Sequence, residues 1–510
     1  MLGNAYVFTL VSTGYQDALV KVEANIARGL PCFHMVGLAE KGVKESRDRV
    51  RAALVNSGFV FPKQRVLVNL SPGDLTKTGC YFDLAVALSI LMASGQIVSK
   101  VSLDDYVFAS EVGLTGSLMP LIHMPLLLSS RKYHKVCVVS SHTNVPEPIA
   151  IKGSIKGFSD LNEVCHYLCS SDQEATKPVP RINIMTVDEP VESQSLADMN
   201  GSFESKLALI TAIVGRHHLL FVGPPGVGKS MLMGIAHGLQ PKLDEDQMLE
   251  VALLHCQHGD FRYTRQPPLR QPHHHITGPA LMGGGSPILP GEVSLAHHGV
   301  LFLDELTEYA RVLLDQLRQP LIDGKVSISR AYQKITWPAH VQLFAAMNPC
   351  PCGYWGIDER CFCGYLTVKQ YQKRLSGPFL DRIDISVMMD GFDQCPEYID
   401  EYLSLLKSSC NESILEMIQK ARDRQFKRQG CLNRDLSVKL IQQLGFNFNG
   451  FTKNGFEKLS LRRLKIWYSV ALSLADIQGL EPNQTHYDLA YRWCCSKPRC
   501  LILEGGEALV

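Results

Sequence analysis

Short apolar runs separated by polar and helical segments recur along the chain. Alternating apolar positions in 66–70 predict a strand, the nearly continuous apolar run 84–92 predicts a buried helix, and 135–140 is typical of a further buried strand. Residues 1–168 are therefore expected to form a domain that mixes short strands with helices.

The pattern changes twice beyond this region. Residues 169–195 are polar, acidic and contain prolines, which predicts a linker. From 196 to 392 short apolar strands alternate with helices, and this order predicts an α/β domain with a parallel sheet and helices on its faces. Residues 393–510 follow a helical pattern, so a helical C-terminal domain is expected, and the chain shows no internal repeats.

A glycine-rich motif, GPPGVGKS, occupies residues 223–230. It follows the apolar run 219–222 and precedes a helical segment, which is the context that a phosphate-binding loop needs. Its glycines permit tight turns, so that backbone N–H groups and a helix N-terminus face a phosphate. We therefore expect ATP and Mg²⁺ to be held by Gly223, Pro224, Pro225, Gly226, Val227, Gly228, Lys229 and Ser230. Lys229 would reach the β- and γ-phosphates and Ser230 would ligate the magnesium.

Two carboxylates follow a second apolar run. Residues 300–303 predict a buried central strand, and Asp304 and Glu305 come directly after it. Ligands of open parallel sheets bind at the carboxyl ends of the strands. Asp304 is expected to hold Mg²⁺, and Glu305 is expected to orient and deprotonate the attacking water. The plain alternative is a pair of solvated acids, which the complete phosphate loop disfavours.

Three further polar residues are candidates for catalysis. A predicted strand at 341–346 is followed by Asn348, which is placed to position the water, or else simply begins a turn before proline. Arg374 and Arg382 come next. An arginine offered to the γ-phosphate of a neighbouring subunit is a common device of ring ATPases. The alternative for Arg382 is a structural ion pair, for example with Asp384.

Four grouped thiols and two groups of histidines remain. The thiols, which offer four sulfur ligands on one segment, are Cys350, Cys352, Cys361 and Cys363. Four such ligands suit a structural Zn²⁺. The alternative is that they are free cysteines, because the CxC spacing is shorter than the CxxC spacing that is usual for zinc ligands. The histidines are His273, His274, His275, His297 and His298. Their spacing matches no known metal site, so they are expected to lie in loops or to face DNA.

Composition limits the class of protein. A chain of 510 residues is too long for one core, so several domains are expected. Its 20% charged residues and net charge of +1 mean that any contact with nucleic acid depends on local basic clusters. No run is apolar enough to span a bilayer, and the first residues lack a signal-peptide layout. With 16 cysteines read as reduced thiols, a cytoplasmic location is expected.

Several longer blocks make the chain resemble a known family. With the phosphate loop, they are QPHHH at 271–275, GGGS at 283–286, PGEVSLAHHG at 290–299 and NPCPCG at 348–353. These blocks resemble the Mg-chelatase-like AAA+ proteins of the ComM/YifB family, and the similarity extends from Tyr6 to about Arg492. The resemblance implies an AAA+ phosphate-loop ATPase core, an α+β N-terminal domain like the protease domain of Lon, and an α-helical C-terminal lid. It also implies a homo-oligomeric ring, such as a hexamer.

The resemblance assigns roles to matching positions. Arg382 corresponds to the arginine finger, and Arg462 corresponds to a second sensor that touches ATP from the lid. An insertion at 272–299 and a β-hairpin at 325–338 correspond to projections that line the pore of related motors and grip DNA. The hairpin has a basic tip, which includes Arg330 and Lys334. One departure is Gly201-Ser202, where the family usually has Gly-Gln.

In the Lon-like region the protease dyad is missing. The serine of the dyad aligns near Tyr81 and its lysine near Leu127, so neither the hydroxyl nucleophile nor its amine base is present. Because a Ser–Lys dyad requires both groups, we expect no peptidase activity.

The favoured function is an ATP-driven ring motor on single-stranded or branched DNA without sequence preference. Resemblance to the family implies helicase or branch-migration activity in homologous recombination during natural transformation. Two alternatives stay open: a magnesium-chelatase-type motor subunit, and an assembly or chaperone scaffold that ATP switches between shapes.

Overall fold

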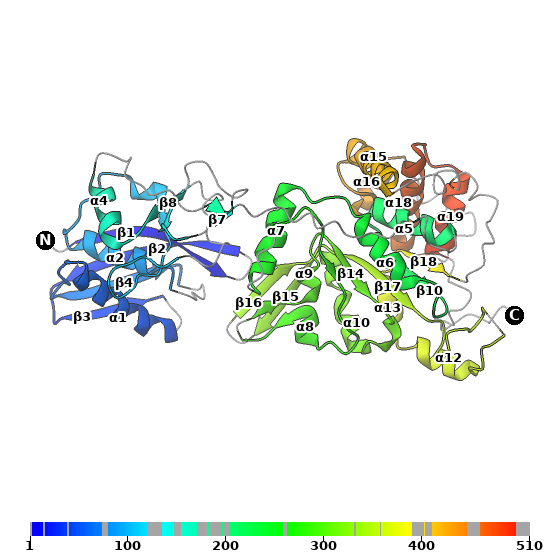
Figure 1. Cartoon of the computed structure of the whole chain (residues 1–510), viewed down its shortest axis with the longest axis horizontal. Helices are drawn as coiled ribbons and strands as arrows, with labels where there is room; N and C mark the ends of the chain where they lie inside the picture. The colour runs from blue at the N-terminus through cyan, green and yellow to red at the C-terminus, as the bar shows by residue number, and fades with distance from the viewer. Residues whose placement is uncertain are drawn as a thin grey trace. The chain divides into compact units, whose positions relative to one another are not determined.

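The structure is a computed structural model (Figure 1), and the residues it describes are 3–13, 16–37, 40–73, 80–120, 135–143, 145–146, 155–170, 181–182, 196, 203–258, 263–286, 288–330, 333–357, 359–389, 402, 411–445 and 459–495. The chain divides into two compact units. The first comprises Met1–Val187, Ala252–Tyr263 and Ser327–Thr336, and the second comprises Asp188–Val251, Thr264–Val326 and Trp337–Val510. The segments predicted as ATPase and as helical domain therefore belong mainly to one unit.

The first unit contains a four-stranded sheet and a smaller parallel sheet. The larger sheet has the order β1-β2-β4-β3 and consists of β1 (Asn4–Thr13), β2 (Gln16–Ala27), β3 (Cys32–Val36) and β4 (Arg65–Ser71). The smaller sheet has the order β5-β6-β8 and consists of β5 (Tyr106–Phe108), β6 (Val136–Ser140) and β8 (Ile155–Phe158). The remaining elements are the pair β7 (Val145–Pro146) and β9 (Arg181–Ile182), and the helices α1 (Glu40–Asn56), α2 (Asp83–Ala93) and α4 (Leu161–Cys169).

The sequence pattern explains the core of this unit. In β4 the side chains of Val66, Val68 and Leu70 are fully buried, because alternate residues of a strand face the same side. Helix α2 is buried on nearly all its faces, as its continuous apolar composition predicted. The predicted strand and helix at 66–70 and 84–92 are thus confirmed.

A five-stranded parallel sheet forms the centre of the second unit, in the order β11-β14-β17-β10-β18. Its strands are β10 (Leu219–Val222), β11 (Leu269–Arg270), β14 (Val300–Leu303), β17 (Gln342–Met347) and β18 (Ile385–Met388). β10, β14 and β17 are buried throughout, as expected for strands covered on both faces. The parallel sheet that the sequence predicted is therefore confirmed.

Helices and short strands surround this sheet. Those of the ATPase segment are α5 (Phe203–Gly215), α6 (Lys229–Gly238), α7 (Glu245–Cys256), α8 (Gly278–Met282), β12 (Gly283–Gly284), β13 (Leu289–Pro290), α9 (Glu292–Leu295), α10 (Arg311–Leu317), α11 (Pro320–Asp323), α12 (Tyr365–Gln372) and α13 (Gly377–Leu380). The predicted hairpin is present as the strand pair β15 (Lys325–Arg330) and β16 (Gln333–Pro338).

The described C-terminal residues are helical. They form α15 (Asn411–Gln429), α16 (Val438–Gln443), α18 (Leu461–Gln478) and α19 (Gln484–Cys494). α18 packs on α19, α15 and α5, and these helices lie together in Figure 1. A single apolar core joins them to the central sheet, and it includes Trp467 and Trp493. None of the described helices has the length and apolar character needed to cross a bilayer.

Candidate nucleotide-binding site

The phosphate loop connects β10 to α6 and depends on its glycines. Gly226 and Gly228 have φ values of +82° and +87°, a region that side chains with a Cβ avoid. A Cβ at Gly223 would lie 2.4 Å from the carbonyl oxygen of Met389. Substitution of any of these glycines would therefore distort the loop.

Lys229 belongs to the phosphate loop and also contacts Asn348, which follows the adjacent strand β17. Its Nζ donates to the carbonyl oxygens of Gly223 (2.7 Å) and Pro224 (2.8 Å) and to Oδ1 of Asn348 (2.9 Å). Burial lowers the pKa of Lys229 to about 8, although Asp304 and Glu305 act to raise it. Lys229 and Asn348, which are far apart in the sequence, thus lie together because β10 and β17 are adjacent and parallel.

The two carboxylates follow β14 at the same edge of the sheet. Oδ1 of Asp304 accepts the backbone N–H of Glu305 at 2.9 Å. Glu305 has φ +48° and ψ +48°, a left-handed conformation that is unfavourable for a residue other than glycine. Its side chain is 60% exposed, so its carboxylate is open to water. The side chain of Ser230 lies outside what the structure describes.

His274 approaches the carboxylate of Glu305. Its Nδ1 lies 3.6 Å from Oε2 of Glu305, and its ring is 23% exposed. Sequence reasoning placed this histidine in a loop or facing DNA and missed its position beside Glu305. No sequence signal pointed to the pair, because the two residues meet only through the path of the segment between β11 and β14.

Arg374 lies near the same carboxylates. It donates to the backbone oxygen of Thr307 (3.0 Å) and to Oε2 of Glu308 (3.2 Å), in the turn that follows Glu305. Its side chain is half exposed. The structure therefore places Arg374 at the carboxyl edge of the sheet.

Arg382 and Arg462 both contact the carboxylate of Asp381, just before strand β18. Oδ2 of Asp381 lies 3.1 Å from Nη1 of Arg382 and 3.5 Å from Nε of Arg462. Oδ1 of Asp381 accepts from Nε of Arg463 at 3.1 Å. Three guanidinium groups thus share one carboxylate, which leaves an excess of positive charge. The ion pair suggested between Arg382 and Asp384 is not formed, since Asp384 pairs with Arg434 at 2.8 Å.

These arginines and the phosphate loop lie at opposite edges of the sheet. β18 runs parallel to β10, with Ile385 opposite Leu219 and Met388 opposite Val222. Arg382 comes before Ile385, at the amino edge, whereas the phosphate loop follows Val222 at the carboxyl edge. A strand of this length spans about 10 Å. The structure therefore does not bring Arg382 or Arg462 to the phosphate loop of their own chain.

The four grouped cysteines come together. Their sulfurs all lie within 4.8 Å of one another. Sγ of Cys350 is 3.2 Å from that of Cys352 and 3.8 Å from that of Cys361. Four sulfurs at about 2.3 Å from one zinc ion would lie about 3.8 Å apart. The spacing of these thiols therefore fits a tetrahedral Zn²⁺ site.

The surroundings of the cysteines also suit thiolate ligands. The backbone N–H groups of Gly353 and Trp355 donate to Sγ of Cys350, at 3.2 and 3.3 Å. Burial raises the pKa of Cys352, but hydrogen bonds with the Tyr354 backbone and the neighbouring thiols outweigh this and lower it to about 6. A Cβ at Gly353 would lie 2.5 Å from Cδ of Pro225, so this segment packs against the phosphate loop.

A second polar cluster joins α7 to the turn before β14. Oε2 of Glu250 lies 2.9 Å from Nε2 of His297 and 2.7 Å from Nε2 of His298. Nδ1 of His297 accepts the backbone N–H of His340 at 3.0 Å, so the proton of the neutral ring is on Nε2 and points to Glu250. The cluster is therefore a hydrogen-bonded clamp, although its three ligand atoms are close enough for a metal.

The position of His297 corrects one expectation. The sequence placed it in a loop or facing DNA, but its side chain is 1% exposed. Burial lowers the pKa of His297 to about 4, so the ring is neutral at physiological pH. His297 therefore lies in a turn, which is one of the two expected placements, and the other placement, facing DNA, does not hold because α7 and the turn before β17 cover the ring.

Comparison with known proteins extends these findings. A family model for magnesium chelatase, subunit ChlI, matches residues 195–396, and a model for subunit ChlI of Mg-chelatase matches residues 22–144. The chain is 37% identical to the competence protein ComM of Haemophilus influenzae over 494 residues, which covers 93% of this chain and 94% of the relative. It is 39% identical to the uncharacterized protein YifB of Escherichia coli over 453 residues, 86% and 85% of the two chains. Lon protease 2 of Bacillus subtilis is a more distant match. It is 28% identical over 179 residues, which cover 32% of this chain and 32% of the relative.

Proposed function

Because the chain belongs to the ComM/YifB family of Mg-chelatase-like AAA+ proteins, we propose that it is an ATP-driven ring motor that acts on DNA. The family itself implies that the protein binds ATP with Mg²⁺ and hydrolyses it. The proposal adds the ring, in which each ATP lies between two subunits, and the polynucleotide substrate.

The separation of the two halves of the site carries the proposal of a ring. Lys229, Asn348, Asp304 and Glu305 gather at the carboxyl edge, while Arg382 and Arg462 lie at the amino edge around Asp381. Within one chain, neither arginine is near the phosphates that Lys229 would hold. A neighbouring copy, arranged head to tail, would bring its arginines to that nucleotide, and head-to-tail contacts close into rings.

Hydrolysis would then follow from residues of two subunits. Lys229 neutralises the β- and γ-phosphates, and Asp304 with Ser230 would hold Mg²⁺, which supplies further charge neutralisation. Glu305 accepts a proton from the attacking water, while Asn348 orients that water. Arg382 of the adjacent copy stabilises the charge that develops on the transferred phosphoryl group.

Similarity to a competence protein supports DNA as the substrate. We propose branch migration or strand separation as the activity, following the resemblance to the ComM/YifB family. The hairpin β15–β16 would grip the DNA. The side chains of Arg330 and Lys334 at its tip lie outside what the structure describes. Contacts through phosphates would be independent of base sequence.

The decisive experiment measures ATP turnover and strand displacement with forked DNA. The expected result is an ATPase rate that rises when forked or single-stranded DNA is added, together with ATP-dependent release of a labelled strand. Blunt duplex DNA and heparin serve as controls for a non-specific polyanion effect. An ATPase rate that no DNA changes would refute the motor on DNA.

Two other functions make different predictions. A magnesium-chelatase motor subunit would be captured by a porphyrin-binding partner subunit and would not displace DNA strands. The match of a chelatase-subunit model to 195–396 favours this alternative. A scaffold switched by ATP would change its oligomeric size with nucleotide but would show no translocation.

We further propose that the cysteine cluster holds a structural Zn²⁺. Four sulfur ligands leave no open coordination position, so the ion would order the segment beside the phosphate loop and perform no chemistry. Metal analysis of protein purified without added metal is expected to give about one zinc per chain. Cys352→Ser together with Cys361→Ser should remove it. Cys431→Ser serves as the control, since this thiol lies outside the cluster.

The first unit is proposed to be a Lon-like domain without peptidase activity. Tyr81, near the position where the resemblance places the serine nucleophile, has its pKa raised to about 12 by burial, so its phenol is a poor nucleophile. The position aligned with the lysine, Leu127, lies outside the described residues. Incubation with casein and unfolded peptides should give no cleavage.

A further inference from the structure

The segment that carries the cysteine cluster exposes three large apolar side chains within five residues. Phe362 is 94% exposed, Leu366 is 72% exposed and Tyr365 is 43% exposed. Single exposed apolar residues are ordinary on a protein surface, whereas several that are grouped mark a contact with another molecule. We call Phe362, Tyr365, Leu366 and Lys369 the α12 surface, since three of the four belong to the first turns of that helix.

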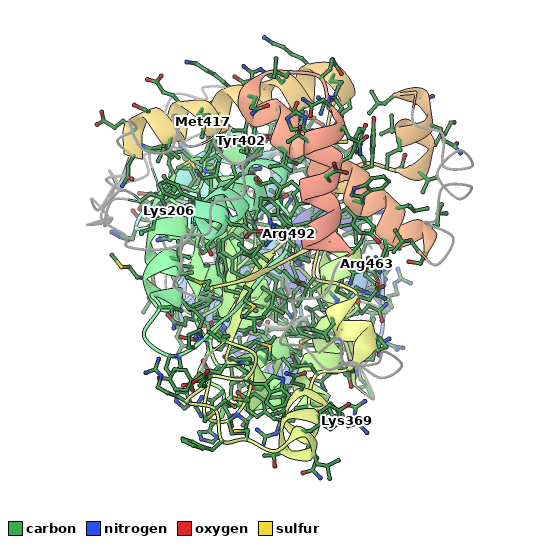
Figure 2. All side chains as sticks on the ribbon, turned by 90° about the vertical axis from the view of Figure 1, so that its right-hand side faces the viewer. Lys206, Lys369, Tyr402, Met417, Arg463 and Arg492 are labelled. Carbon is green, nitrogen blue, oxygen red and sulfur yellow. The ribbon has the colours of Figure 1, made fainter. Side chains whose placement is uncertain are left out.

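The position of Phe362 between two cysteines presents its ring to solvent. Cys361 and Cys363 flank it, and both belong to the cluster of four sulfurs. A Zn²⁺ ion bound there would fix the backbone on both sides of the ring. A side chain that is already held in place loses little conformational entropy when it binds a partner. Helix α12 lies at the lower margin of the second unit in Figure 1, and Lys369 lies there in Figure 2.

The charge on this helix is positive. From residue 361 to residue 380 the sequence contains the cations Lys369, Lys373 and Arg374 and no acid. Arg374 is engaged in the ion pair described above. The ammonium of Lys369 lies 5.9 Å from the centre of the Tyr365 ring and forms no ion pair within the part of the chain that the structure describes. An exposed ring and a cation thus lie side by side.

The acids nearest along the chain lie before the second pair of cysteines. They are Asp358 and Glu359, and Arg360 follows them directly. The guanidinium of Arg360 also stacks on an aromatic ring, 4.4 Å from the ring centre of Tyr354. Residues 358–374 together carry four cations and two acids. An excess of positive charge therefore remains even though one of the four cations is paired.

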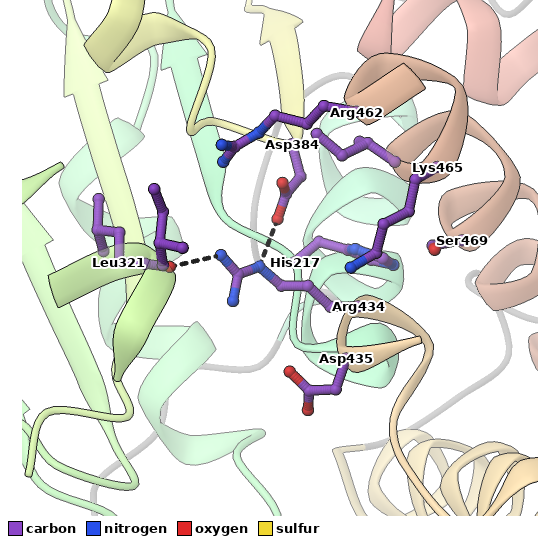
Figure 3. Close-up of a pocket in the computed structure, with 10 residues that line it drawn as sticks. His217, Leu321, Asp384, Arg434, Asp435, Arg462, Lys465 and Ser469 are labelled. Atoms are coloured by element: carbon purple, nitrogen blue, oxygen red, sulfur yellow. Dashed lines mark hydrogen bonds and ion pairs between the residues drawn. The ribbon is translucent and has the colours of Figure 1, made fainter. Parts of the chain in front are cut away.

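The cavity of about 330 Å³ at the amino edge of the sheet, shown in Figure 3, has a different character. Its Arg434 is paired with Asp384 at 2.8 Å, and Asp435 also lines it. The residues on its wall include no Phe, Tyr or Trp. Its cations are therefore set among acids, whereas the α12 surface offers rings and cations together.

Two kinds of macromolecule can cover such a surface, a single-stranded nucleic acid or a second copy of the chain. Contacts between proteins are depleted in lysine. Sites for single strands combine aromatic rings, on which bases stack, with cations that contact the backbone. The lysine beside the exposed rings therefore favours a nucleic acid.

We propose that the α12 surface binds single-stranded DNA, with Phe362 stacked on an unpaired base and Lys369 in contact with a phosphate. Stacking requires an unpaired base but no particular sequence, because every base has a π face. The inference rests on the DNA substrate proposed above. It adds a contact outside the hairpin β15–β16.

The test measures binding of labelled oligo(dT) to the full chain by fluorescence anisotropy over a range of salt concentrations. Phe362→Leu keeps an apolar side chain but removes the ring, so the affinity should fall about fivefold or more, with an unchanged dependence on salt. Lys369→Gln should reduce the slope of log affinity against log salt by about 0.7, as expected for one lost phosphate contact. Phe426→Leu, whose ring is 54% exposed on α15, is the matched control and should bind as the wild type does.

Two further measurements separate stacking from charge. An abasic oligonucleotide of the same length offers no base, so Phe362→Leu and the wild type should bind it equally. Phe362→Trp keeps an aromatic face and should retain the affinity for oligo(dT).

The outcomes distinguish this inference from the proposed function. Equal affinity of the wild type and Phe362→Leu for oligo(dT) would overturn the inference and leave the motor on DNA standing. A smaller oligomer for Phe362→Leu in sedimentation, with unchanged DNA affinity, would assign the surface to a second copy and also overturn it. Absence of any DNA binding by the wild type would refute the proposed function as well.

Discussion

The carboxyl and amino edges of the central sheet differ in how their charges are balanced. At the carboxyl edge Lys229 is held by two backbone oxygens and Asn348, beside the carboxylates of Asp304 and Glu305. At the amino edge the guanidinium groups of three arginines surround the single carboxylate of Asp381. The first edge has acceptors and acids ready for a metal-bound triphosphate, and the second has spare positive charge. In the ring proposed above, the two edges of neighbouring copies would complete one another.

The largest effect should come from the carboxyl edge. Lys229→Ala removes the cation that would neutralise the β- and γ-phosphates, so ATP turnover should fall to background. A coupled ATPase assay and a titration with a fluorescent ATP analogue measure the loss. Lys420→Ala, whose lysine is 67% exposed, is the matched control. Normal turnover in Lys229→Ala would remove the loop from the mechanism.

Arg382→Ala tests the amino edge. An arginine that reaches a neighbour's γ-phosphate contributes about 10³-fold or more to turnover. Turnover in the assembled protein should therefore fall by about 10³, while nucleotide binding by the isolated chain is unchanged. Arg374→Ala, at the other edge and bonded to Thr307, should lose less than about tenfold. A larger loss for Arg374 than for Arg382 would reverse the assignment.

Glu305→Gln tests whether the carboxylate at the carboxyl edge acts as the general base. The amide keeps the shape of the side chain but cannot accept the proton of the attacking water, so turnover should fall about 10²-fold or more. ATP should still bind with near-normal affinity. Single-turnover measurements separate the two quantities. A variant that hydrolyses ATP at the normal rate would show that Glu305 is not the base.

The smallest effect concerns stability at the amino edge. Arg463, labelled in Figure 2, donates to the backbone oxygens of Leu380, Ile383 and Cys494, all at 3.1 Å. Arg463→Ala leaves these acceptors without partners and should lower the free energy of unfolding by about 2 kcal/mol. Urea denaturation followed by tryptophan fluorescence measures this change.

Arg492 provides the control for that measurement. It is also labelled in Figure 2, and its Nε lies 3.3 Å from Glu204 on a side chain that is half exposed. Exposed ion pairs contribute about 0–1 kcal/mol. Arg492→Ala should therefore destabilise less than Arg463→Ala. Equal effects would mean that Arg463 does not join the helical part to the sheet.

Features that depend on neighbouring residues were predictable. The loop at 223–230 needs glycines next to a strand and a helix, and β10, β14 and β17 are short apolar runs. Features that depend on which strands and helices become neighbours could not be predicted from the sequence. His274 beside Glu305, the clamp at Glu250, and Arg462 beside Arg382 involve residues that the chain path alone does not relate.

The amino-acid sequence by itself determined the nucleotide chemistry, because a phosphate loop and a strand ending in two acids are local patterns with few other uses. Only the tertiary structure decided which polar groups share an edge. The order β11-β14-β17-β10-β18 is not the order along the chain, so it brings Asn348 to Lys229. Because β18 is parallel to β10, Arg382, which precedes β18, lies at the opposite end of the strands, where Arg462 of α18 joins it at Asp381. Parallel strands separate their two ends by their own length, and that distance keeps Arg382 away from the phosphate loop of its own chain.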